Sequence, residues 1–480
     1  MRRFFAKNLL FVISVNLLVK PVWIFMIDRT VQNTVGHSSY GPYQALFNLG
    51  IIFNILLDFG ISNYNSKTIA QDPEKIKQLF PAMLSARVIL SLLYVTIVSC
   101  IGLVIGYRRW EIGLLLGILI IQALNSVMLF VRSNVAGLHK FRADGLLSVT
   151  DRFLMIVVCG VLLFYPPLAK QFRIEWFVGA QIACYGAAII IGMMVLKKIS
   201  GVRLHFSIDR HQIFAIIKDS FPYALLIFLM SIYTRVDVVL IERLCGDAGR
   251  EQAGIYAHGY RLLDVGNMFG LMFASMLLPI FGRMLAQKTS VQPIVQLCVN
   301  LLLPTSFLVM ITGIFFSSEL MHLLYKDVSA TDAKVFTWLM IAFPAFSLSN
   351  IYSTLLTANG NLKLLNKIAF IGVVINLGLN FILIPKYLSV GAAFTAFITQ
   401  SVLAIAFIIF AQKQAQLTKD LNRAGSFLIY LLILFLAGYG VKYLHIHWLI
   451  QLVALFGFGI VLMITLRFIS LRSIKQLISK

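Results

Sequence analysis

About fourteen apolar stretches, each long enough to cross a lipid bilayer, occupy nearly all of this 480-residue chain. The polar segments between them are at most about two dozen residues long. This pattern predicts an all-α polytopic membrane protein, because backbone polar groups in a bilayer must be satisfied within helices or closed barrels. No soluble domain is expected, so any function must lie inside the helix bundle or at its mouths. The predicted spans are 8–27, 41–64, 83–106, 112–136, 146–168, 174–196, 221–242, 253–282, 293–317, 333–358, 364–385, 389–411, 426–444 and 447–468.

The composition agrees with this pattern. Apolar residues make up 59% of the chain and charged residues 12%, and the mean hydropathy is +0.88. Arg2 and Arg3 precede the first apolar run, as they would in a signal peptide, but no small-residue cleavage site follows before Trp23. The first run is therefore predicted to remain as a membrane span.

The net charge of +22 raises the question of a nucleic-acid partner. The cations are scattered one or two per loop and form no stripe, so no nucleic-acid partner is expected. With a cytoplasmic N-terminus, about 27 loop cations lie inside and about 11 outside, which is the bias of the positive-inside rule. We therefore expect both termini in the cytoplasm, and this assignment counts Arg87 among the cytoplasmic cations.

The cysteines give no sign of a cross-link or a metal. They are far apart, with no CxxC pair and no histidine-rich spacing, so neither a disulfide framework nor a metal site is predicted. No cofactor is expected other than a coupling ion, H⁺ or Na⁺. The five cysteines are Cys100, Cys159, Cys184, Cys245 and Cys298.

Two weak echoes relate the first six spans to the next six. The stretch 41–43 resembles 254–256, and 137–140 resembles 360–363. If the echoes are real, the halves are parallel repeats related by an axis along the membrane normal, with a site between them. Chance recurrence of short glycine motifs is the alternative. The predicted parts are an N-terminal lobe (1–200), a C-terminal lobe (201–415), and spans 13 and 14 with a basic cytoplasmic tail (416–480).

Spans 10 to 12 carry an ordered set of residues that identifies a family. They read Leu356, Thr357, Ala358, Asn359, Gly360, then Asn376, Leu377, Asn380, Leu383, Ile384, Pro385, then Gly391, Ala392, Ala393; further matches are Tyr40 to Tyr43, Asp58 to Gly60, Arg235 to Asp237, Gly246, and Gly254 to Tyr256. This order resembles the multidrug/oligosaccharidyl-lipid/polysaccharide (MOP) exporter superfamily. It is most similar to the polysaccharide-transporter branch, the Wzx-like flippases of lipid-linked oligosaccharides.

The resemblance implies two six-helix lobes around a central cavity that opens alternately to the two sides, plus two C-terminal helices. It also implies a glycan on an undecaprenyl diphosphate carrier as substrate, a bacterial inner-membrane location, and O-antigen or similar polysaccharide assembly with a polymerase as partner. One departure is that Lys20 is the basic residue of span 1, where the related lipid II flippases carry several arginines. Lipid II is therefore disfavoured as the substrate.

Three cations, Lys20, Arg235 and Arg261, fall inside apolar spans, where a charge normally faces a partner or a watery cavity. By helix rise they lie about 10–13 Å from the outer ends of their spans. Cations at one depth could together neutralise a diphosphate. The alternatives are that Lys20 snorkels to the interface and that Arg261 pairs with Asp264 on its own helix.

Other polar residues in the spans complete the predicted site. Asp264, nearly mid-span, is the best candidate for ion coupling, with Asp237 and Asp58 as further candidates. Asn16 and Asn48 lie on polar helix faces that suit sugar hydroxyls, although such residues also hold membrane helices together.

These features together predict a flippase and no enzymatic activity. A drug or metabolite antiporter of the same superfamily is the closest rival, but it should have an anionic pocket. An integral-membrane polysaccharide polymerase or ligase should carry a long outer loop, and none is present.

Overall fold

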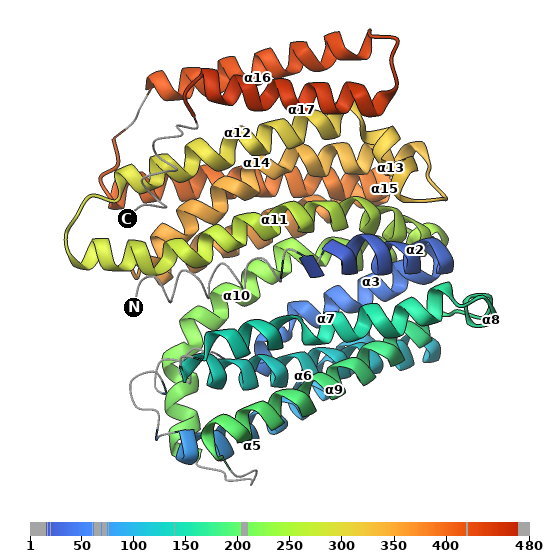
Figure 1. Ribbon diagram of the computed structural model, residues 1–480, viewed down its shortest axis with the longest axis vertical. Coiled ribbons are helices and arrows are strands. Elements are labelled where there is room, and N and C mark those ends of the chain that lie inside the picture. The colour runs from blue at the N-terminus through green and yellow to red at the C-terminus, as the bar shows by residue number, and fades with distance from the viewer. Residues whose placement is uncertain are drawn as a thin grey trace. The chain divides into compact units, whose positions relative to one another are not determined.

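The computed structural model describes residues 16, 18–19, 21–59, 61, 69, 74, 76–138, 140–202, 210–418 and 421–468. All regular structure in these residues is helical (Figure 1). The chain separates into two compact units, Met1–Val239 and Leu240–Lys480, and the division falls inside one helix, α10. The predicted all-α fold is confirmed, while the predicted lobe boundaries after residues 200 and 415 stay a prediction.

The first unit is built on α6, the helix with the most buried apolar stretch of that unit. In α6, 56% of this stretch is buried, against 22% for α5. Helices α3, α5, α7 and α9 all pack on α6. A β-carbon at Gly117 would lie 2.6 Å from Cγ1 of Val178, so a glycine allows α6 and α9 to approach this closely. The elements of this unit are η1 (Trp23–Asp28), α2 (Arg29–Val35), α3 (His37–Ile52), η2 (Asn54–Leu57), α5 (Ile76–Ile105), α6 (Arg109–Gly137), α7 (Phe141–Phe164), α8 (Pro166–Ala169), α9 (Ile174–Ser200) and α10 (Arg210–Leu244).

The second unit is built in the same way on α14, whose apolar stretch is 67% buried. Helices α11, α12 and α15 pack on it. A β-carbon at Gly313 of α12 would lie 2.5 Å from Cγ of Met340 on α14, so this crossing also depends on a glycine. The elements are η4 (Gly246–Ala248), α11 (Gly249–Ala286), α12 (Gln292–Phe315), α13 (Ser317–Leu324), α14 (Ala330–Ala358), α15 (Leu362–Gln414), α16 (Leu421–Lys442) and α17 (Trp448–Thr465).

The 53-residue element α15 is a helical hairpin, because its backbone leaves the helical conformation at Leu388 (φ 54°, ψ −136°). A β-carbon at Gly391 would lie 2.5 Å from the Leu383 carbonyl oxygen, and one at Gly372 would lie 2.9 Å from Cδ2 of Leu403. Eight residues of straight helix would span about 12 Å, so these approaches require the chain to reverse. The two arms correspond to the predicted spans 364–385 and 389–411.

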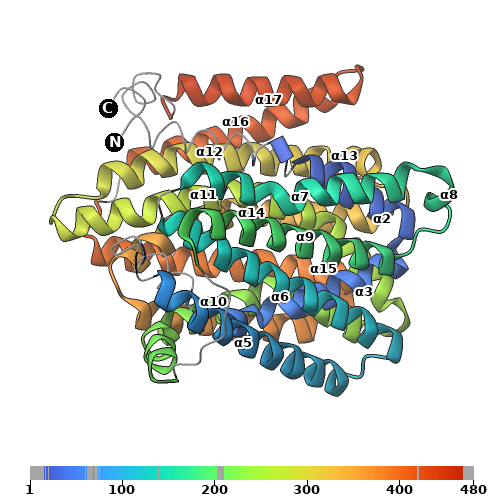
Figure 2. The same cartoon turned by 60° about the horizontal axis from the view of Figure 1, so that its bottom comes forward.

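Helices α16 and α17 pack on α12, and both views draw the three side by side (Figures 1 and 2). Tyr430 and Leu455 are fully buried in the shared apolar cluster, which also holds Leu308 of α12. A β-carbon at Gly459 would lie 2.5 Å from Cδ1 of Leu308, which shows how closely α17 approaches α12. The last two helices are thus part of the second unit's core.

Ten helices among the described residues are long and apolar enough to span a membrane. They carry eleven of the predicted spans, since α15 carries two. Half of the first predicted span, 8–27, lies outside the described residues. The second falls on the 16-residue α3 and on η2, and the eighth lies within the 38-residue α11. The protein is therefore a multi-pass membrane protein, as predicted.

Candidate functional site

The three predicted phosphate-binding cations lie on different parts of the chain. Lys20 falls outside the described residues. Arg235 is on α10 in the first unit and Arg261 on α11 in the second, and both are half-buried. Arg235 lies within the membrane-spanning stretch Ala224–Leu244. A joint role of the three in binding a diphosphate stays a prediction.

The two predicted sugar-binding asparagines have different surroundings. Asn16 donates a hydrogen bond from Nδ2 to Oγ of Ser148 on α7, 2.9 Å away. Asn48 on α3 is 1% exposed, and neither its amide nitrogen nor its oxygen has a hydrogen-bond partner among the described residues. A buried amide without hydrogen bonds carries a desolvation cost. Of the two asparagines, Asn48 is therefore the one whose side-chain polar atoms are available to a water or a ligand.

Replacing Asn48 with leucine separates packing from binding. We expect the variant to be more stable by about 1–3 kcal/mol, because an apolar group of similar size carries no desolvation cost at this buried position. If Asn48 binds substrate, glycan transport falls in the same variant. Thermal unfolding and transport measured together test this, and a stabilised variant that transports normally would remove Asn48 from the site.

The three predicted coupling acids are all at least partly buried. Asp237 on α10 is 1% exposed, and Asp264 on α11 is half-buried. Asp58 forms a salt bridge with Arg87 of α5. None of these contacts identifies a coupling ion, so the assignment stays a prediction.

Arg87 is a buried charged residue of the first unit that the sequence interpretation did not single out. Its side chain is 1% exposed, and its Nη1 donates to the Ser126 carbonyl oxygen at 2.8 Å as well as to the Ser126 hydroxyl. Its guanidinium carbon lies 5.0 Å from the centre of the Phe130 ring. The sequence interpretation placed Arg87 only as a cation on the cytoplasmic side, which stays a prediction, and did not foresee its burial. Helix α5 begins at Ile76 and carries Arg87 into the packed bundle. Its place inside an apolar run was the signal in the sequence.

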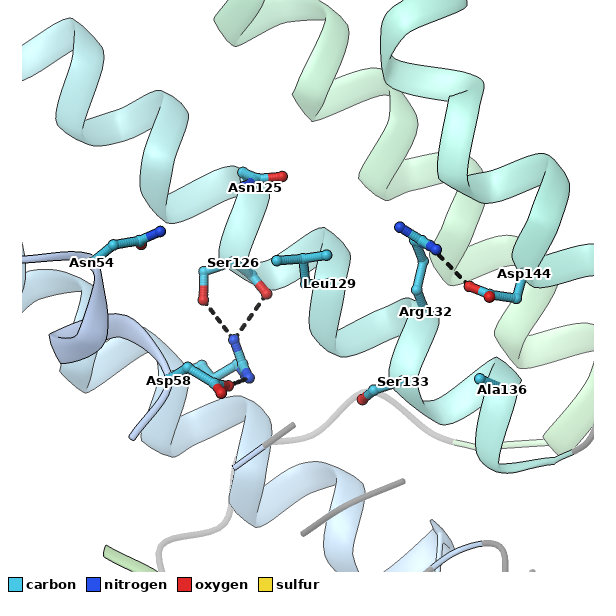
Figure 3. Close-up of a pocket in the computed structure, with 10 residues that line it drawn as sticks. Asn54, Asp58, Asn125, Ser126, Leu129, Arg132, Ser133, Ala136 and Asp144 are labelled. Atoms are coloured by element: carbon cyan, nitrogen blue, oxygen red, sulfur yellow. Dashed lines mark hydrogen bonds and ion pairs between the residues drawn. The ribbon is translucent and has the colours of Figure 1, made fainter. Parts of the chain in front are cut away.

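A pocket of about 340 Å³ lies beside Arg87, at the end of the unit where α6 passes into α7. Figure 3 shows two ion pairs on opposite sides of Leu129. One is the Asp58 to Arg87 pair. The other joins Nε of Arg132 on α6 to Oδ1 of Asp144 in the first turn of α7, at 2.8 Å. The pocket is therefore lined mainly by polar and charged residues, although its helices are apolar overall.

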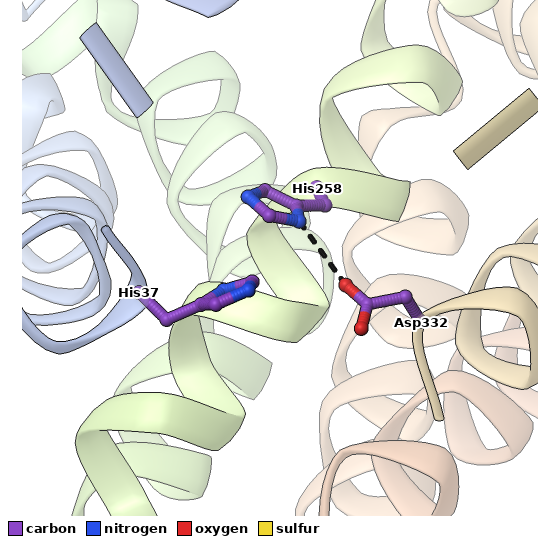
Figure 4. Close-up of side chains that lie close together, drawn as sticks. All are labelled: His37, His258 and Asp332. Atoms are coloured by element: carbon purple, nitrogen blue, oxygen red, sulfur yellow. Dashed lines mark hydrogen bonds and ion pairs between the residues drawn. The ribbon is translucent and has the colours of Figure 1, made fainter. Parts of the chain in front are cut away.

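The second unit contains a buried histidine and aspartate pair (Figure 4). Nδ1 of His258 lies 3.1 Å from Oδ1 of Asp332, and the two residues are 4% and 1% exposed. Oδ2 of Asp332 accepts hydrogen bonds from the backbone nitrogen of Ser329 (2.9 Å) and from its hydroxyl (2.7 Å), and these contacts cap α14. The His258 ring stacks on Tyr325 at 3.7 Å. These residues fix the start of α14 against α11, a role that the sequence interpretation did not assign.

Comparison with known proteins agrees with this architecture. The profile of a family described as "Polysaccharide biosynthesis protein" matches residues 5–285, and the MatE profile matches residues 222–382. The capsular polysaccharide biosynthesis protein CapF of Staphylococcus aureus is 25% identical over 235 residues, which are 48% of this chain and 58% of CapF. The chain thus spans somewhat more than half the length of this curated relative.

Several solved structures share the fold. The lipid II flippase MurJ, in an inward closed conformation, matches with a TM-score of 0.70 and 16% identity over 95% of this chain and 98% of that chain. An inward-facing multidrug resistance MATE family transporter matches with a TM-score of 0.62 and 14% identity over 82% of this chain and 94% of that chain. The chain therefore belongs to the polysaccharide biosynthesis protein family, within the MOP exporter superfamily that its sequence resembles.

Proposed function

We propose that this protein is a flippase that moves an undecaprenyl-diphosphate-linked oligosaccharide from the inner to the outer leaflet of a bacterial cytoplasmic membrane. The observation that carries the proposal is the match of residues 5–285 to the polysaccharide biosynthesis family. The similarity of the whole fold to a lipid II flippase supports it. The product would serve cell-surface polysaccharide assembly such as O-antigen, with a polymerase acting after it.

Transport would proceed by alternating access. The glycan and the diphosphate cross through a polar path, while the polyprenyl tail stays in lipid. Lys20, Arg235 and Arg261 neutralise the diphosphate, since multiple fixed donors suit phosphate oxygens. A gradient of H⁺ or Na⁺ drives the cycle through an acid within the spans, with Asp264 as the first candidate.

The direct test uses purified protein in liposomes that contain a fluorescent short-chain polyprenyl diphosphate bearing one N-acetylglucosamine. Dithionite added outside quenches the label in the outer leaflet only, so any further loss of fluorescence shows that label has crossed from the inner leaflet. With the protein we expect all of the fluorescence to be quenched, and without it only the part that comes from the outer leaflet. A fluorescent phosphatidylcholine that stays protected in the same liposomes controls for unspecific scrambling.

The same liposomes distinguish the drug antiporter. That function would move a cationic aromatic dye under an H⁺ or Na⁺ gradient and leave the glycan carrier in its leaflet. Dye transport with a protected glycan carrier would therefore overturn the flippase proposal.

The topology gives a separate prediction. Lys198, in the last turn of α9, and Glu251, in the first turn of α11, are both exposed. By the positive-inside bias, we expect cysteine at position 198 to react from the cytoplasm and cysteine at position 251 from outside. Labelling of intact cells with a membrane-impermeant maleimide, on a cysteine-free background, measures this. Reaction of position 198 from outside would reverse the assigned orientation.

A further inference from the structure

The polar pocket beside Arg87 has no assigned role in the proposed transport cycle. It lies within the first unit, between η2, α5 and α6 and the first turn of α7 (Figure 3). By the positive-inside assignment, the end where α6 passes into α7 is the cytoplasmic end. Its volume of about 340 Å³ is at the small end of the range for ligand pockets, enough for a short piece of glycan.

Among the described residues that line the pocket, the charges balance. Two arginines, Arg87 and Arg132, face two acids, Asp58 and Asp144, in two salt bridges. A free anion entering the pocket would meet both carboxylates, and a free cation would meet both guanidinium groups. The pocket therefore favours a ligand with no net charge and many hydrogen-bonding groups.

Several polar groups of the pocket have capacity left for such a ligand. Arg132 uses only Nε, and Asp144 only Oδ1, in hydrogen bonds with the described residues. The two terminal nitrogens of Arg132, here called the Arg132 fork, can thus still donate hydrogen bonds, and the other carboxylate oxygen of Asp144 can still accept them. Asn54 and Asn125 line the same pocket, and neither side-chain amide forms a hydrogen bond within the described part of the chain. These are paired donors and acceptors, which match adjacent hydroxyl groups on a ring.

We propose that this pocket binds a neutral sugar of the substrate glycan on the cytoplasmic side, an assignment that rests on the proposed flippase function. The Arg132 fork and the two asparagine amides hold adjacent sugar hydroxyls. The exposed Leu129 side chain offers apolar surface to the face of the sugar ring. The diphosphate does not enter this pocket, because its charge would be opposed by Asp58 and Asp144.

The test measures binding to the full-length protein in lipid nanodiscs with three probes. They are a short-chain polyprenyl diphosphate alone, the same carrier with N-acetylglucosamine, and the same carrier with glucuronic acid. We expect the neutral sugar to tighten binding relative to the bare carrier. Asn54→Ala and Asn125→Ala should each reduce that gain by about three- to tenfold, the loss expected for one hydrogen bond, without changing the affinity for the bare carrier.

Matched controls separate binding from folding. Asn359 is an exposed asparagine of the second unit whose amide bonds Gln414, so Asn359→Ala should leave all three affinities unchanged. Because Asn54 and Asn125 form no hydrogen bonds with the described residues, their variants should unfold at the same temperature as the unmodified protein.

Two results would overturn the sugar site while leaving the flippase proposal intact. One is full preference for the sugar-bearing carrier in the Asn54→Ala Asn125→Ala double variant. The other is tighter binding of the glucuronic acid carrier than of the neutral one. A protein that binds neither the bare nor the glycosylated carrier would instead contradict the proposed function itself, and the sugar site with it.

Discussion

Replacing Arg87 with alanine is expected to lower the free energy of unfolding by about 3–5 kcal/mol, because it deletes a buried side chain together with its salt bridge and hydrogen bonds. The guanidinium is 1% exposed, and it contacts Asp58 and the Ser126 carbonyl oxygen. Its loss removes the cation that Asp58 faces and leaves a space beside the Phe130 ring. For a unit of this size, the unfolding midpoint should fall by about 6–20 °C. Thermal unfolding of the purified protein, followed by tryptophan fluorescence, measures the shift.

Two variants make this result interpretable. Arg132→Ala removes a guanidinium of the same pocket that is 26% exposed, against 1% for Arg87, and should cost only about 0–1 kcal/mol. Arg87→Gln combined with Asp58→Asn removes both charges and should recover much of the lost stability. If Arg87→Ala unfolds no earlier than Arg132→Ala, the buried pair does not stabilise the bundle.

Removing the charge of Lys20, Arg235 or Arg261 is expected to weaken binding of the glycosylated carrier by about 1–3 kcal/mol, or about 5- to 150-fold. Each cation would contribute a charge-assisted hydrogen bond to the diphosphate, and the neutral side chain of a variant cannot form that bond. Arg235→Lys should lose more than its retained charge suggests, because a guanidinium holds phosphate oxygens through two fixed donors. Glycan export is measured beside the amount of protein in the membrane.

The matched control for these variants is Lys386→Ala, an exposed cation near the turn of α15. It should export normally, because an exposed side chain there has no assigned part in the transport path. Normal export by all three alanine variants, or failure only because the protein is absent from the membrane, would show that these cations are structural.

The sequence predicts the fold well, because the bilayer imposes one rule on every span. A run of about 20 apolar residues must become a helix there, whatever its neighbours are. Both arms of α15 follow from this rule, and Pro385 and Gly391 mark the reversal between them. Family motifs in the same region also indicate the superfamily.

Side-chain partners were harder to predict, because the residues that form them are far apart in the chain. Arg87 and Asp58 are 29 positions apart, and His258 and Asp332 are 74 apart. Whether a charged residue near the end of a span is solvated or buried depends on where the helix begins and on which helix covers it. A single sequence fixes neither to within a turn, so it does not predict that Arg87 is buried in the core.

The reversal at Leu388 has a consequence for how the protein is made. The turn is pinned to α11 by Ser389, whose hydroxyl donates to Oε1 of Gln252 at 2.6 Å, and Tyr387 beside it is 60% exposed. Almost no polar chain separates the two arms, so the insertion machinery has no hydrophilic loop to carry across the membrane at this point. Both arms can therefore leave the translocon together as a preformed pair. Tyr387 at the tip then stops at the far headgroups and sets the depth of the pair in the bilayer.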